Sequence, residues 1–220
     1  MISTMLALLL SLLPLTLAAD GSEDTCICNL LERPEVLKKK ERARWMVHSL
    51  NYGVLSTIST RLPDSPPFGN IYSFVDGDCE SSSGTPYFYG TYLDQSFKDM
   101  EMNPIASFTL TEASLPSVCS GTPLKACTAQ SGRGDPEMPV CARLTLTGKL
   151  VEVTGSEYDS AKSALLHRHP VMMYWPTDHD WVIAKLEIED IWFIDYFGGA
   201  SILDVGEYFD VDLFPSPERL

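Results

Sequence analysis

Apolar and polar positions alternate in several short segments of the chain, and a period of two predicts strands. The clearest segment is 105–111, where Ala106, Phe108 and Leu110 alternate with serine and threonine. β-branched and aromatic composition predicts further strands at 53–60, 71–75, 86–93, 140–153, 181–188 and 190–197. Since helices do not alternate with these segments, the pattern favours an antiparallel sheet of six or seven strands over a parallel one.

The strand at 140–153 changes phase in its middle. Leu144 and Leu146 share one parity, whereas Val151, beyond Gly148, has the other. A slip of one residue at a glycine predicts a bulge or a sharp bend. Such bends turn the corners of small barrels, so a small β-barrel with flanking helices fits the pattern best.

Helical spacing predicts a first helix that begins at Pro34 and runs through Leu50. Its opposite face is basic, and we interpret that face as solvated: Lys38, Lys39, Lys40, Arg42 and Arg44. A nuclear localisation signal or an anion site is the alternative interpretation of this run. One or two helical turns are expected at 94–101.

The stretch from Ser160 to Gly199 holds three of the four histidines and three of the four tryptophans. A Thr-x-x-Glu capping box at Thr154–Glu157 predicts a helix that ends before Pro170. An aromatic turn follows, and then two strands that we expect to be joined at Glu189-Asp190.

The N-terminus has the features of a secretory signal peptide. Met5 to Leu17 is almost wholly apolar and is followed by small residues, but it is too short to span a membrane. We therefore expect a signal peptide at 1–19, an N-terminal extension at 20–33, one domain at 34–214 and a disordered tail at 215–220. No later segment has the length of a membrane span, and the net charge of −14 disfavours direct nucleic-acid binding.

The six cysteines predict disulfides in a secreted chain, and six allow 15 full pairings. Cys119, Cys127 and Cys141 lie in one irregular segment at 116–139 and its border, so a bond that closes this loop is expected. Cys26 and Cys28 are too close together to pair with each other without strain. The cysteine spacing does not match a zinc site.

The sequence gives little evidence for a catalytic or metal site. A metal site is disfavoured because two histidines in His-x-His at a helix end point in different directions; its members would be His167, His169, His179, Asp178 and Asp180. All residue types of a Ser–His–Asp hydrolase occur, but G-x-S-x-G is absent. The aromatic residues of the stretch are interpreted as core and interface packing, with stacking of a flat ligand as the alternative. The residues alone predict a secreted, disulfide-bonded, non-enzymatic barrel.

Four motifs in a fixed order resemble the CREG family, whose name denotes a cellular repressor of genes stimulated by an adenoviral early protein. They are RWMVHSLNYGVLSTIST at 44–60, GTPYFY at 84–89, NPIASFTLT at 103–111 and HRHPVMMYWPTDHDWVIAKLEIEDIWFIDYFGG at 167–199. The resemblance covers about 34–212. It implies an FMN-binding split barrel similar to pyridoxamine-phosphate oxidases, a homodimer, and a secreted or endolysosomal regulator of growth and differentiation that has lost flavin binding.

The resemblance also guides the site expectations, which include no catalytic, cofactor-binding or metal-binding residue. The expected partners are a second copy of the chain and a cell-surface or sorting receptor, and the candidate surface residues are Trp175, Trp181, Trp192, Tyr196 and Phe197. An FMN-dependent oxidoreductase is the alternative function. Its phosphate would need convergent basic groups, and the basic residues considered, each interpreted as a surface charge, are Arg143, Lys149, Lys162 and Arg168.

Two features depart from the family pattern. The chain has no N-x-Ser/Thr sequon, so receptor sorting through N-linked glycans is not available to it. The cysteine-rich loop has one cysteine more than expected. We therefore expect Cys119 to pair with Cys141, with the partner of Cys127 left open.

Overall fold

The computed structural model describes residues 28, 31–115, 118–119, 122–123, 127 and 135–215. The expected signal peptide, nearly all of the segment at 20–30 and the tail at 216–220 lie outside these residues. Within the described part of the chain, no helix is long and apolar enough to cross a membrane.

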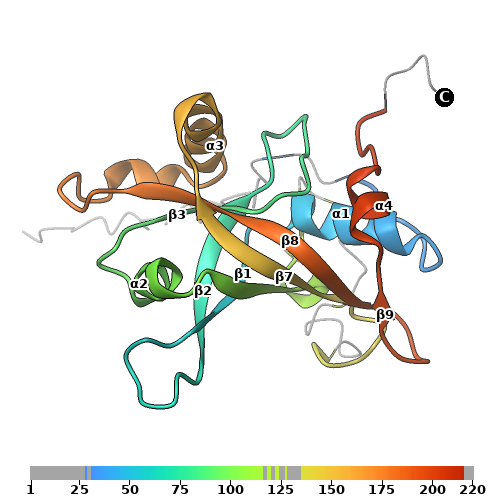
Figure 1. Cartoon of the computed structure of the whole chain (residues 1–220). Coiled ribbons are helices and arrows are strands. Elements are labelled where there is room, and N and C mark those ends of the chain that lie inside the picture. The colour runs from blue at the N-terminus through green and yellow to red at the C-terminus, as the bar shows by residue number, and fades with distance from the viewer. Residues whose placement is uncertain are drawn as a thin grey trace, which may run out of the picture.

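Six antiparallel strands form a closed barrel, as predicted (Figure 1). The strand order is β3-β2-β1-β4-β7-β8, and an additional pairing between β3 and β8 closes the ring. A seventh strand, β9, pairs with the end of β8. The bounds are β1 (Tyr52–Ile58), β2 (Pro67–Val75), β3 (Tyr87–Gly90), β4 (Ile105–Thr111), β7 (Arg143–Glu152), β8 (Val182–Ile194) and β9 (Ser201–Ile202). A separate two-stranded hairpin consists of β5 (Val118–Cys119) and β6 (Thr122–Pro123).

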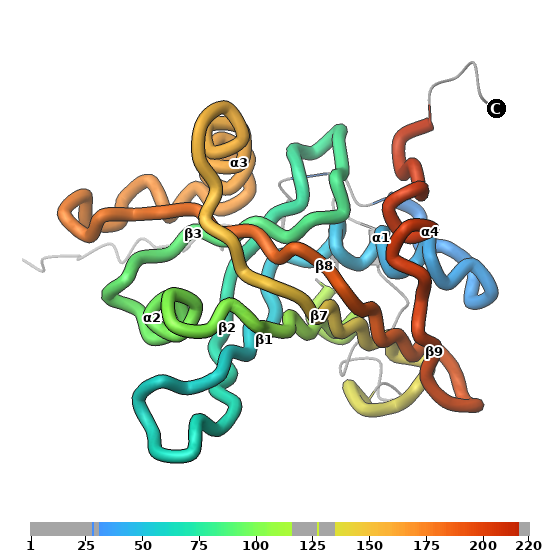
Figure 2. Tube along the Cα trace, in the orientation of Figure 1, coloured from blue at the N-terminus to red at the C-terminus, as the bar shows by residue number. Residues whose placement is uncertain are grey.

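Among the described residues, four helices flank the barrel, together with the 3₁₀ turns η1 (Glu112–Ser114) and η3 (Pro170–Tyr174). Figure 2 shows α3 near β3 and the start of β8, whereas α1 and α4 lie side by side near β9. The helices are α1 (Lys39–Ser49), α2 (Gln95–Met102), α3 (Gly155–Arg168) and α4 (Val205–Phe209). The short α4 was not predicted from the sequence.

Aromatic rings fill the centre of the barrel. Phe108 is fully buried and meets Phe74 and Phe88 edge to face, at ring-centroid distances of 4.8 and 4.9 Å. Edge-to-face geometry is favourable because the positive ring edge meets the negative face. These three rings come from β4, β2 and β3, so the core joins both sides of the closed barrel.

The predicted bulge exists, but it lies on the partner strand. Thr147 pairs with Asp190 and Gly148 with Ile188, which leaves Glu189 of β8 as the extra residue. The expected phase change in β7 is wrong at this point, because Leu150 remains on the buried face. Gly148 is required here, since a Cβ atom at this position would overlap the carbonyl oxygen of Glu187.

The same bulge corrects the expectation of two strands joined at Glu189-Asp190. β8 is one continuous strand from Val182 to Ile194. The two acidic residues are exposed because the bulge turns them out of the sheet, and it needs no turn to do so.

The first helix begins at Lys39 rather than at Pro34. Its predicted basic face is only partly solvated, because Arg42 and Arg44 are 0% and 2% exposed. Arg44 donates to the backbone carbonyls of Tyr208 and Ser82, at 3.2 and 2.8 Å. Buried guanidinium groups need such partners, and residues far away in the sequence supply them.

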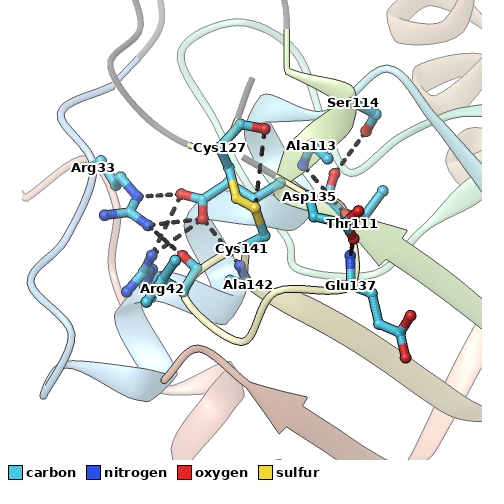
Figure 3. The surroundings of a disulfide bond; sticks show 12 residues. Arg33, Arg42, Thr111, Ala113, Ser114, Cys127, Asp135, Glu137, Cys141 and Ala142 are labelled. Carbon is cyan, nitrogen blue, oxygen red and sulfur yellow. Dashed lines mark hydrogen bonds and ion pairs between the residues drawn. A yellow bond between two sulfur atoms is a disulfide. The ribbon is translucent and has the colours of Figure 1, made fainter. Parts of the chain in front are cut away.

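Arg42 is paired with two buried carboxylates. It donates to Glu112 at 3.1 Å and to Asp195 at 3.3 Å. Glu112 also accepts from Arg33 and, at 3.0 Å, from the backbone N–H of Ala142. Burial raises the pKa of Glu112, and the cation Arg33 opposes that shift. In Figure 3 these donors converge beside the Cys127–Cys141 disulfide.

This disulfide closes the irregular loop as expected, but the specific pairing of Cys119 with Cys141 is wrong. Cys141 bonds to Cys127, and their Cα atoms lie 5.2 Å apart, within the usual range for a disulfide. A second disulfide joins Cys28 to Cys79, at a Cα separation of 5.1 Å. It ties the N-terminal segment to the loop after β2.

Removal of the Glu112 carboxylate should strongly destabilise the fold. Glu112→Ala leaves Arg42 buried with a weaker set of partners, and loss of one member of a buried pair costs about 3–5 kcal/mol. Glu207→Ala is the control, because its pair with Lys40 is largely exposed and such pairs contribute about 1 kcal/mol or less. Urea unfolding measures both changes. Equal losses of stability in the two variants would contradict this description of the network.

Candidate functional site

The predicted surface residues divide into two groups at opposite ends of β8. Trp175 and Trp181 are half-buried and pack on Tyr89, and the Trp181 and Tyr89 ring centroids lie 4.8 Å apart. The ring centroids of Trp175 and Trp181 lie 5.0 Å apart, so the three rings form one cluster. These two tryptophans therefore support the core beneath α3 as well as reaching the surface.

The second group lies at the far end of β8. Trp192 points outward opposite Ile202 of β9, and Tyr196 and Phe197 are 54% and 64% exposed. At about 3.3 Å per residue, Trp181 and Trp192 lie roughly 35 Å apart. The five candidates therefore do not make one patch. We call Trp192, Tyr196, Phe197 and Ile202 the β8-end surface.

A cavity of about 790 Å³ lies between the loop at 76–83 and one face of α3. Its lining also includes Tyr87 of β3. Sequence reasoning missed this site, although the Asp-Gly-Asp turn and the serine run that follows it were visible signals. The loop and the helix lie about 80 residues apart in the sequence, and only closure of the barrel brings them together.

The loop wall is held by a buried carboxylate. Asp76 accepts from His48 Nδ1 at 2.9 Å, from Ser82 Oγ at 2.5 Å and from the N–H of Gly84 at 3.3 Å. Gly77 has a φ of +150°, and a Cβ atom there would overlap the carbonyl oxygen of Ser81. The Cys28–Cys79 disulfide fixes the same loop covalently.

The helix wall is held by Glu157. This carboxylate accepts from the phenol of Tyr87 at 2.8 Å and from Lys185 at 2.9 Å. The predicted capping box is therefore wrong. Thr154 occupies the N-cap position, but its side chain makes no capping bond, and Glu157 is bonded to β3 and β8.

These bonds shift two pKa values. The hydrogen bond from Lys185, followed by that from Tyr87, lowers the pKa of Glu157. Burial and then the neighbouring Glu157 raise the pKa of Tyr87 to about 12. The pair thus keeps an ionised carboxylate and a neutral phenol at the cavity wall near neutral pH.

The hydrolase alternative finds no geometric support among the described residues. His48 and Asp76 form a buried pair, but Ser82 donates to Asp76 rather than to His48. The Nε2 atom of His48 has no hydrogen-bond partner within the part of the chain that the structure describes. A serine nucleophile would need the imidazole as its base, and this arrangement does not provide that contact.

The candidate metal ligands do not converge. His169 Nε2 lies 3.0 Å from the carbonyl of Phe74, His179 packs against Trp181, and His167 lines the cavity. In the described part of the chain, no group of three histidine, cysteine or acidic side chains is arranged to hold a metal ion.

The residues present do not fit a flavin phosphate. Lys149 is exposed and paired with Glu189, whereas Arg168 is buried and donates to the carbonyl of His48 at 3.0 Å. Interpretation of Arg168 as a surface charge is therefore wrong. Lys162 lies over the ring of Tyr158, and Arg143 begins β7, six positions before Lys149. The four cations lie in different places, and the cavity lining carries carboxylates that repel phosphate.

Comparison with known proteins identifies the barrel. The family model described as "CREG, beta-barrel" matches residues 34–210. The chain belongs to the CREG family. Protein CREG1 of Gallus gallus is 39% identical over 172 residues, which cover 77% of this chain and 84% of that protein. Protein CREG1 of Homo sapiens is 38% identical, with 77% and 72% of the two chains covered.

Solved structures share the fold at low sequence identity. A heme binding protein from Mycobacterium smegmatis superposes with a TM-score of 0.58 at 20% identity and covers 81% of this CREG chain. The match spans 61% of the mycobacterial protein, less than two thirds of its length. ChuZ from Campylobacter jejuni gives a TM-score of 0.51 at 17% identity, with 77% and 60% of the two chains covered. These likenesses support the split-barrel fold and no more.

Replacement of Glu157 should change the titration of Tyr87. Glu157→Gln removes the anion beside the phenol, so the pKa of Tyr87 falls from about 12 but stays above its ordinary value near 10, because burial is the larger cause. NMR of the tyrosine ring carbon bonded to oxygen measures this pKa. Tyr92 is the matched control, since burial and Glu152 raise its pKa to about 12. If the pKa of Tyr92 fell as much as the pKa of Tyr87, the effect of Glu157 would not be local.

Proposed function

We propose that this CREG-family protein is a secreted or endolysosomal regulator of cell growth and differentiation that acts without catalysis, as a dimer, by binding a partner. Two observations together support the proposal. Aromatic side chains are exposed at the end of β8, and the basic residues considered for a flavin phosphate do not converge on one point. A receptor at the cell surface or in sorting is the expected type of partner. The two disulfides at Cys28–Cys79 and Cys127–Cys141 are consistent with the secretory pathway.

The β8-end surface supports self-association. Trp192 and Ile202 are cross-strand partners on the outer face, and Phe197 and Tyr196 continue this apolar area beyond the strand. Aromatic residues are enriched in the cores of protein interfaces because they bury a large area with little loss of side-chain freedom. A contact between two copies would remove these side chains from water.

The charge arrangement disfavours the oxidoreductase alternative. Flavin mononucleotide carries a phosphate, and convergent cations hold such groups most strongly. The cavity between the loop at 76–83 and α3 has carboxylates in both walls, at Asp78 and Asp159, and neither lysine nor arginine lines it. A flavin phosphate would meet like charge there.

Phe197→Asp should convert the dimer into a monomer, because it places a charge at the centre of a contact that must be dry. Sedimentation velocity measures the change, and circular dichroism checks the fold. Tyr174→Asp is the control, since Tyr174 is 85% exposed on η3 and lies outside the β8-end surface. A Phe197→Asp protein that remains dimeric, or a Tyr174→Asp protein that dissociates, overturns this choice of surface.

The purified protein should be colourless and should leave the fluorescence of added FMN unchanged. Gel filtration of a mixture with FMN separates bound from free flavin, and riboflavin, which lacks the phosphate, serves as the matched ligand. Flavin absorbance that co-elutes with the protein would favour the oxidoreductase over the non-catalytic regulator.

A further inference from the structure

The cavity between the loop at 76–83 and α3 has a lining rich in hydroxyl groups. Its hydroxyls belong to Ser81, Ser82, Ser83, Ser160, Ser163 and Tyr87. Only Ala161, Ala164 and Gly77 contribute no polar side chain, and neither lysine nor arginine lines the cavity. Ligand sites usually combine apolar walls with a few polar groups, so this lining is unusual.

The polar groups of the lining differ in what they can bond. Carboxylates only accept hydrogen bonds, whereas serine hydroxyls both donate and accept. A ligand with many hydroxyl groups matches both types, because each of its hydroxyls also donates and accepts. An anionic ligand is repelled by the carboxylates.

Two of the four carboxylates already have side-chain partners. Asp76 is bonded to His48 and Glu157 to Lys185. Of the other two, Asp78 accepts from the N–H of Glu80 and from the side chain of Ser81, and the Asp159 carboxylate has no hydrogen-bond or ion-pair partner in the described part of the chain. The carboxylates of Asp76 and Glu157 are therefore already engaged, whereas hydroxyl donors of a neutral ligand can reach those of Asp78 and Asp159.

Both walls hold their shape without a ligand. The disulfide at Cys79 and the three bonds to Asp76 fix the loop, and the bonds from Tyr87 and Lys185 to Glu157 fix the helix against the barrel. The Ser163 hydroxyl has no hydrogen-bond partner in the described part of the chain, and Ser160 donates to the carbonyl of Ser156 while its oxygen can still accept. A preformed cavity with free groups loses little entropy when it binds.

We infer that this cavity binds a neutral saccharide unit, through the serine hydroxyls and the carboxylates of Asp78 and Asp159. Its volume of about 790 Å³ lies within the range of roughly 300–1,000 Å³ that small-molecule sites occupy. The inference goes beyond the proposed function, because the cavity lies within one chain and needs neither a dimer nor a protein partner.

The test is a ¹H–¹⁵N NMR titration of the full mature chain with methyl α-D-glucoside and methyl α-D-mannoside. We expect shift changes confined to 76–83 and 157–167. Ser163→Trp fills the cavity from an exposed position and should weaken binding at least tenfold. Ser156→Trp, on the same helix but outside the lining, should bind as the wild type does. The monomeric Phe197→Asp protein should also retain binding, which separates this inference from the proposed dimer.

The source of the saccharide is distinguished by a second ligand. An oligosaccharide released from a glycoprotein should bind more tightly than the methyl glycosides if the natural ligand is a glycan, and equally if it is a free sugar. Shifts caused by spermidine but not by the glycosides overturn the inference in favour of a cation site. Absence of any shift, or shifts that survive Ser163→Trp, overturns it altogether.

Discussion

A buried carboxylate determines how distant parts of this chain must meet. Glu112 is inaccessible to solvent, and an ionised carboxylate in that environment is unstable without several donors. Arg33 and Arg42 supply two of them and the N–H of Ala142 supplies a third. The N-terminal segment, α1, the end of β4 and the start of β7 are thereby joined at one point, beside the disulfide that closes the irregular loop.

Much of the barrel could be predicted from the sequence, because alternation and β-branched residues report burial on one face of a strand. The charges could not be placed in this way. Arg42 and Arg44 have the spacing of a solvated helix face, and only the residues opposite them in space make them buried. The bulge was detected through Gly148, but its extra residue is Glu189 on the neighbouring strand. A single strand's pattern holds no information about which of two paired strands has the additional residue.

The candidate sites, like the fold, could be predicted only in part. The aromatic residues of the stretch at 160–199 were recognised, yet β8 carries them to opposite ends of the barrel, with Trp181 in the core cluster and Phe197 in solvent. The cavity beside α3 was missed because its walls are joined by contacts between distant residues, such as Tyr87 with Glu157. Within this CREG barrel, closure through β3 and β8 brings the walls of that cavity together, and aromatic side chains at the end of β8 are exposed.

We propose that the β8-end surface holds two copies of the chain together, and hydrogen exchange provides the sharpest test of this contact. Backbone amides should be compared at protein concentrations well below and well above the dimer dissociation constant. Added protection is expected at high concentration and only at 192–202, with η3 and the cavity loop unchanged. Protection that does not depend on concentration, or that arises at 170–175 instead, would contradict it.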